Sequence, residues 1–127
     1  MQISTIVIAQ HEQSIAQGLA NELHAHFTRV LVAESAVELH ALLLRHRARA
    51  AVLDTETMSL EEISQLSSAF SDLAIVATHR SPDERMWMAA LNAGALEFCH
   101  PLDIRSILRA TRAAAKPTLP SLRKDTA

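Results

Sequence analysis

A strand-like run followed by a helix-like run recurs five times along the chain, and this alternation limits the possible folds more than any other feature. The strand-like runs are short and apolar, and they fall at residues 3–9, 29–33, 50–54, 73–78 and 97–99. The stretches between them carry apolar residues at helical spacing. Strands joined by helical crossovers lie parallel, with helices on both faces of the sheet. We therefore predict an α/β fold with a doubly wound, five-stranded parallel sheet.

Capping residues place the helices. Ser35 with Glu38 three residues later matches a capping box, and Ser59 can begin a helix with acids in its first turn. Pro82 is expected in the first turn of the following helix, where its missing N–H needs no partner, and Gly94 ends that helix. The predicted helices lie near residues 13–26, 35–47, 59–70, 82–94 and 103–116. We assign residues 1–116 to one domain and residues 117–127 to a polar, Pro-containing tail or linker stub.

Composition argues against several classes of protein. The 127 residues are 49% hydrophobic, and 12 basic against 14 acidic residues give a net charge of -2, which offers no general attraction for nucleic acid or anionic membrane. Gly18 and Gly94 are the only glycines, which argues against the glycine-rich loops of dinucleotide-binding enzymes and NTPases. A single cysteine, Cys99, and the lack of a signal-like or membrane-spanning run predict a cytoplasmic protein.

Chemically active side chains follow several predicted strands directly. Asp54 ends the third run, Thr78 ends the fourth, and His100 follows the fifth. The carboxyl ends of parallel strands meet at one edge of the sheet, where open α/β folds build their sites. We therefore expect these side chains to lie near one another, beside residues 10–12, which leave the first strand.

This arrangement resembles the receiver domain of two-component response regulators over about residues 3–116. Residues 52–54 match the strand that ends in the family's phospho-accepting aspartate, and residues 75–78 match the strand that ends in its phosphoryl-binding Ser or Thr. Residues 93–95 match its glycine turn, and Phe98 and Pro101 match its switch aromatic and the proline after its lysine.

The resemblance implies a flavodoxin-like fold and a non-enzymatic role in phosphorelay signal transduction. Asp54 would accept phosphate from a histidine kinase or a phosphotransfer protein, and Thr78 and His100 would contact the phosphoryl group. Mg²⁺ would be the cofactor of that transfer.

Several positions depart from the family's pattern. Gln10 and His11 stand where the family has a pair of acids, His100 stands where it has lysine, and Met58 stands where it usually has proline. Mg²⁺ prefers carboxylate oxygens, so an amide and an imidazole are poor substitutes. The alternative carboxylates that could bind a metal together with the acceptor aspartate are Glu12 and Glu56.

Two alternatives to a phospho-acceptor remain open. One is a pseudo-receiver, an interaction module that works without phosphorylation; the replaced acids and lysine favour it, whereas Asp54 and Thr78 favour the phospho-acceptor. The other is a small flavin- or metal-binding protein. His11, His79 and His100 all follow predicted strands, and imidazoles with a carboxylate are a known zinc or iron ligand set.

The last predicted helix carries four cations at spacings that put them on one stripe. A solvated face is the simple interpretation, and a docking surface is the other. In the receiver family, the fourth helix, fifth strand and fifth helix form the face for dimerisation and partner contact. We expect self-association or partner binding there, with Trp87 either partly in the core or in the exposed patch, and no direct contact with nucleic acid. The cations are Arg105, Arg109, Arg112 and Lys116.

Overall fold

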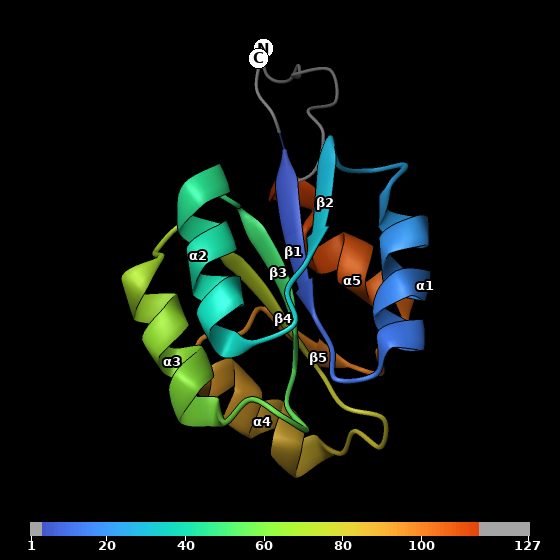
Figure 1. The fold of residues 1–127 in the computed structure, drawn as a ribbon. Coiled ribbons are helices and arrows are strands. Elements are labelled where there is room, and N and C mark those ends of the chain that lie inside the picture. Colours follow the sequence, from blue (N-terminus) through green and yellow to red (C-terminus); the bar gives the residue numbers. More distant parts are fainter. Residues whose placement is uncertain (1–3, 115–127) are drawn as a thin grey trace, which may run out of the picture.

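The computed structural model describes residues 4–114. Within this range, five parallel strands form one sheet in the order β2-β1-β3-β4-β5 (Figure 1). The predicted doubly wound, five-stranded parallel sheet is confirmed. The strands are β1 (Thr5–Ala9), β2 (Arg29–Val32), β3 (Ala50–Asp54), β4 (Ala74–Thr78) and β5 (Glu97–Cys99).

Helices cover both faces of this sheet. They are α1 (Gln13–Leu23), α2 (Ala36–His46), α3 (Leu60–Ala69), α4 (Glu84–Ala93) and α5 (Ile104–Ala110), followed by the short 3-10 turn η1 (Arg112–Ala114). Figure 1 shows α2, α3 and α4 on one side of the sheet and α1 and α5 on the other. Among the described residues, no helix has the length and apolar character needed to cross a membrane.

Side chains of β3 alternate between two cores. Ala51 and Leu53 pack into the core beneath α2, α3 and α4, whereas Ala50 and Val52 pack into the core beneath α1 and α5. Every residue of β3 is buried, which explains its uninterrupted apolar sequence. Two layers of helices therefore hold Asp54, at the end of this strand, in place.

Side-chain caps begin the helices on the first of these faces. Ser59 and Glu62 form a complete capping box: the Ser59 hydroxyl accepts the Glu62 N–H at 3.1 Å, and the Glu62 carboxylate accepts the Ser59 N–H at 2.8 Å. The Ser35 hydroxyl likewise accepts the Glu38 N–H at 3.1 Å. The Glu38 carboxylate, however, accepts the N–H of Glu34 instead of that of Ser35, so the second half of the predicted box is displaced by one residue.

The start of α4 differs from the prediction. Pro82 was expected in its first turn, but the helix begins two residues later, at Glu84. Asp83 is the N-cap residue because its carboxylate accepts the N–H of Met86 at 2.8 Å. Pro82 therefore belongs to the loop that leads into the helix.

The end of α5 also differs from the prediction. The helix was expected to continue to about Lys116, which lies outside the described residues, but it ends at Ala110. The N–H and the hydroxyl of Thr111 both donate to the carbonyl of Ile107, at 3.0 and 2.8 Å. Such side-chain bonding competes with the regular helical pattern, and the chain continues as a 3-10 turn.

Candidate functional site

Asp54 lies at the carboxyl end of β3, and only 2% of its surface is exposed. One carboxylate oxygen, Oδ1, accepts the N–H of Glu56 at 2.8 Å. The other, Oδ2, accepts the backbone N–H of His11 at 3.1 Å and also bonds to the Nδ1 atom of the His11 ring. Both oxygens of this buried carboxylate are therefore occupied by partners from the protein itself.

His11 is the second residue after β1, and 34% of its side chain is exposed. The hydrogen bond to Asp54 raises the pKa of His11 above its ordinary value of 6.5, and the negative charges of Asp54 and Glu56 act in the same direction. Burial and Arg80 oppose this shift. The contact with Asp54 therefore stabilises the cationic form of the ring, and in that form His11 and Asp54 are an ion pair at the sheet edge.

Thr78 lies next to Asp54, because the two residues are register partners on β4 and β3. Its hydroxyl is fully buried, accepts an N–H of the Gln10 side chain at 2.9 Å, and donates to the Leu53 carbonyl at 3.3 Å. Gln10 and His11, the two residues that replace the family's acid pair, thus engage Thr78 and Asp54 respectively. The site's expected nucleophile and its expected hydroxyl are both held by the loop after β1.

Glu56 pairs with Arg80, a residue that the sequence analysis did not identify. The guanidinium donates from Nη2 to Oε1 at 2.9 Å and from Nε to Oε2 at 3.0 Å, and the Arg80 backbone N–H donates to Oε2 at 3.2 Å. These bonds lower the pKa of Glu56 from 4.5 to about 2. Arg80 also lies 4.0 Å from the carboxylate of Glu12. The only sequence signal for this pair is that Arg80 follows β4 closely.

His79 and His100 bond to their own loops. The Nδ1 atom of His79 accepts the N–H of Ser81 at 2.9 Å, and that of His100 accepts the N–H of Leu102 at 3.0 Å. Neither ring makes a hydrogen bond to Asp54 among the described residues. The structure therefore brings together Asp54, Thr78 and His11, but it does not join His79 and His100 to them by hydrogen bonds.

The donor set at this edge does not fit a magnesium ion. Within residues 4–114, no group of three or more His, Cys, Asp or Glu side chains is arranged to bind a metal, so Glu12, Asp54 and Glu56 do not form one cluster, and neither do the histidines. Glu56 is neutralised by Arg80, and the Asp54 carboxylate already accepts N–H groups on both oxygens. Mg²⁺ prefers several hard oxygen ligands in octahedral geometry, and at this edge it would have to compete with these cationic and N–H partners.

The α4–β5–α5 side carries large apolar side chains that are exposed to solvent, among them Trp87 and Met88. Trp87 is 41% exposed, and its indole N–H lies 3.4 Å from the Glu97 carboxylate, so the exposed-patch interpretation of this residue is the better one. Arg105 and Arg109 lie on α5, and Arg112 lies in η1 and not on a continuous helix. The fourth predicted cation, Lys116, lies outside the described residues.

Comparison with known proteins identifies the fold. No family model matches the chain, and no curated protein matches it in sequence. Solved structures match it closely: a response regulator from Thermotoga maritima (TM-score 0.78, 17% identity, covering 89% of this chain and 98% of that chain) and the N-terminal signal receiver domain of a response regulator from Bacteroides fragilis (0.77, 22%, 92% and 100%). A CheY-like protein, TadZ, from Pseudomonas aeruginosa also matches (0.71, 24%, 94% and 100%). The chain has the receiver fold.

Proposed function

We propose that this chain is a pseudo-receiver, a receiver-fold interaction module that does not require phosphorylation of Asp54. The observation that carries the proposal is the occupation of that carboxylate. Oδ2 bonds to the backbone and the ring of His11, and Oδ1 bonds to the N–H of Glu56. These bonds use three of the four lone pairs of the carboxylate, so only one lone pair of Oδ1, on a side chain that is 2% exposed, is left to attack phosphorus.

The surrounding charges support the same proposal. Phosphoryl transfer is mostly positioning and charge neutralisation, supplied by a metal ion and a cation at the transferring oxygens. Here the group beside Asp54 is the His11 ring, whose raised pKa favours a cation that would neutralise the carboxylate, and the guanidinium of Arg80 is committed to Glu56. The hydroxyl of Thr78 is committed to Gln10 and Leu53. In this proposal the His11–Asp54 pair replaces the ion pair that a phosphorylated, metal-bound site would contain.

The module acts by binding, not by catalysis, and its partners are proteins. The α4–β5–α5 side is the candidate contact face, since it carries exposed apolar and charged side chains. A cytoplasmic location agrees with one cysteine, Cys99, whose pKa is raised to about 12 by burial and which is therefore an unreactive thiol.

A phospho-accepting response regulator is the second candidate. The observation in its favour is the retained pair of Asp54 at the end of β3 and Thr78 in register beside it. In that case the His11 ring would have to leave Asp54 before a histidine kinase or phosphotransfer protein could deliver phosphate, and a metal would have to enter at the same place.

Intact mass after incubation with a small-molecule phosphodonor, with and without Mg²⁺, distinguishes the two candidates. We expect no adduct on the native chain. The double variant Gln10→Asp with His11→Asp restores two acids and removes the competing cation, and we expect it to gain an Mg²⁺-dependent adduct, which Asp54→Asn in the same background removes. An Mg²⁺-dependent adduct on the native chain that disappears in Asp54→Asn would overturn the pseudo-receiver proposal.

A further inference from the structure

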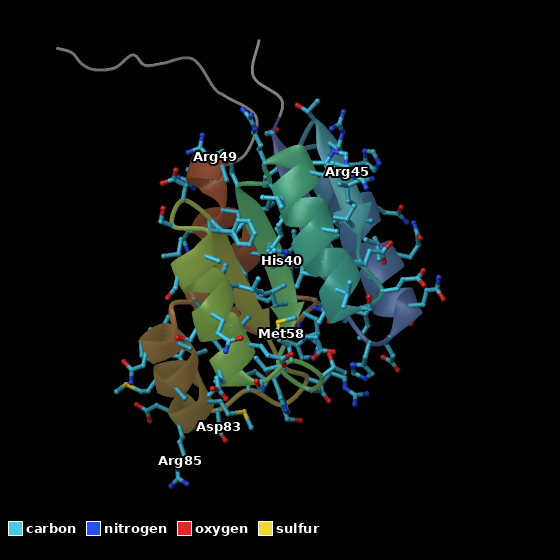
Figure 2. The ribbon with its side chains drawn as sticks, turned by 60° about the vertical axis from the view of Figure 1, so that its left-hand side comes forward. His40, Arg45, Arg49, Met58, Asp83 and Arg85 are labelled. Carbon is cyan, nitrogen blue, oxygen red and sulfur yellow. The ribbon has the colours of Figure 1, made fainter. Side chains whose placement is uncertain are left out.

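An open hollow of about 450 Å³ lies at the end of the molecule opposite Asp54. It is formed where α2 ends, in the loop before β3, and in the segment between α3 and β4. Its apolar walls include Leu44, Phe70 and Leu73, and its charged rim includes Arg47, Arg49 and Asp72. Figure 2 shows Arg45 and Arg49 at this end of the molecule, and Met58, Asp83 and Arg85 toward the other. The hollow is therefore separate from the Asp54 site.

The rim of the hollow is predominantly cationic. Arg47 and Arg49 are exposed, and their side chains make no hydrogen bond or ion pair with any other described residue between 4 and 114. Arg45 is exposed on the last turn of α2, and Arg29 donates to the His46 ring at 2.9 Å on the same end of the molecule. This concentration of cations contrasts with a net charge of -2 for the whole chain.

Arg47 has an unusual backbone for its residue type. It is the C-cap of α2 with φ 49 and ψ 49, the left-handed conformation in which glycine is the usual residue. Its backbone N–H, not its side chain, bonds to the carbonyls of Leu43 and Leu44. Glycine would keep these bonds and relieve the conformational strain, so the guanidinium is not needed for the helix end.

We propose that this hollow binds an acidic segment of a partner protein, with an apolar side chain of the segment in the hollow and carboxylates on Arg47 and Arg49. Apolar walls and two guanidinium groups together fit such a segment, because arginine binds carboxylates in a bidentate manner. A nucleic acid or anionic membrane fits less well, since it would bring no apolar side chain and would meet Asp72 at the rim. The proposal does not depend on whether Asp54 accepts phosphate.

Selection of random peptides displayed on phage against the native chain tests the proposal. We expect the selected peptides to combine acidic residues with a central apolar residue. In fluorescence anisotropy, Arg47→Gly and Arg49→Glu should each weaken binding of a selected peptide by about tenfold or more, as expected for loss of a charge-assisted contact. Arg85→Glu makes the same charge change as Arg49→Glu at the opposite end, and it should leave binding unchanged.

Thermal melting separates a lost contact from a lost fold, because Arg47→Gly should melt at the same temperature as the native chain or higher. The proposal is overturned if no acidic peptides are selected, or if they bind Arg47→Gly and Arg49→Glu as well as the native chain. It is also overturned if Arg85→Glu weakens binding equally. Oligothymidylate and vesicles containing phosphatidylserine serve as rival probes: tighter binding of either one, lost in the same two variants, would replace the proposal with a general anion surface.

Discussion

At the scale of single residues, the His11–Asp54 pair should make stability depend on pH. The pKa of His11 is raised in the folded chain, so its contribution is complete below about 6.5, the value of the unfolded chain, and is lost as pH rises through the higher folded value. We expect the urea midpoint of the native chain to fall above neutral pH. His11→Gln, which cannot be protonated, should be less stable than the native chain near pH 6 and should lose that slope.

The opposite dependence is expected from Glu56, whose pKa is lowered to about 2 by Arg80. Its contribution is complete above 4.5 and is lost as pH falls toward 2. The native chain should therefore be most stable in a window between these two limbs, and His11→Gln should remove only the alkaline one. His26→Gln, which changes an exposed histidine, is the control. Equal slopes in the native chain and in His11→Gln would rule out the ion pair as their source.

Residue identity predicted which groups gather at the sheet edge, but not what they bond to. Asp54 and Thr78 could be placed side by side because each ends a buried apolar strand, and parallel strands align their ends. That His11 would turn onto Asp54 and Arg80 onto Glu56 depends on side-chain rotamers in loops, for which periodicity carries no signal. The sequence gives one hint of the His11–Asp54 pair: a histidine, which can carry a positive charge, stands where the receiver family has an acid.

At the scale of elements, Gly94 allows the end of α4 to pack closely against α3. It caps α4 with φ +116, and a Cβ atom there would lie 2.6 Å from the Cβ of Ser67 on α3 and collide with its hydroxyl. We expect Gly94→Ala to cost about 2 kcal/mol, partly from the strained backbone and partly from this collision. Urea unfolding of the variant measures the loss.

A double-mutant cycle separates the two parts of that loss. Ser67→Gly removes the colliding atoms and alone should cost about 1 kcal/mol, as glycine does inside a helix. Adding Gly94→Ala to Ser67→Gly should cost less than adding it to the native chain, because only the backbone strain remains. Strictly additive losses would mean that the collision is relieved in some other way.

The ends of some elements could be predicted from the sequence. The ends of others depend on side-chain hydrogen bonds that the sequence pattern does not reveal. β3 and β5 were predicted with the bounds that the structure has: β3 is buried throughout, and β5 has two buried residues, Phe98 and Cys99. The predicted start of α4 was wrong because the carboxylate of Asp83, the residue after Pro82, accepts the N–H of Met86 and caps the helix there. The end of α5 was wrong because the bond from the Thr111 hydroxyl to Ile107 has no periodic signature.

At the scale of the whole molecule, the exposed groups of α4, β5 and α5 suggest that two copies can associate. Trp87 and Met88 are 41% and 53% exposed on α4, and Arg109 is exposed on α5, where one guanidinium nitrogen lies 3.2 Å from the Ser106 hydroxyl. In a two-fold symmetric dimer, the same face of both copies forms the interface. The arginines of one copy would then lie opposite acids of α4 and β5 of the other copy. The available acids are Asp83, Glu84 and Glu97.

Charge reversal tests this association directly. Arg109→Glu combined with Arg112→Glu would place like charges opposite each other in both halves of a symmetric dimer, so we expect a dimer to become a monomer by multi-angle light scattering. Arg29→Glu combined with Arg45→Glu changes the net charge equally at the opposite end of the molecule and should leave the dimer intact. If the mass of the first variant is unchanged, or if both variants dissociate, the α4–β5–α5 side is not the self-association face. The exposed Trp87 would then be expected to contact a different protein.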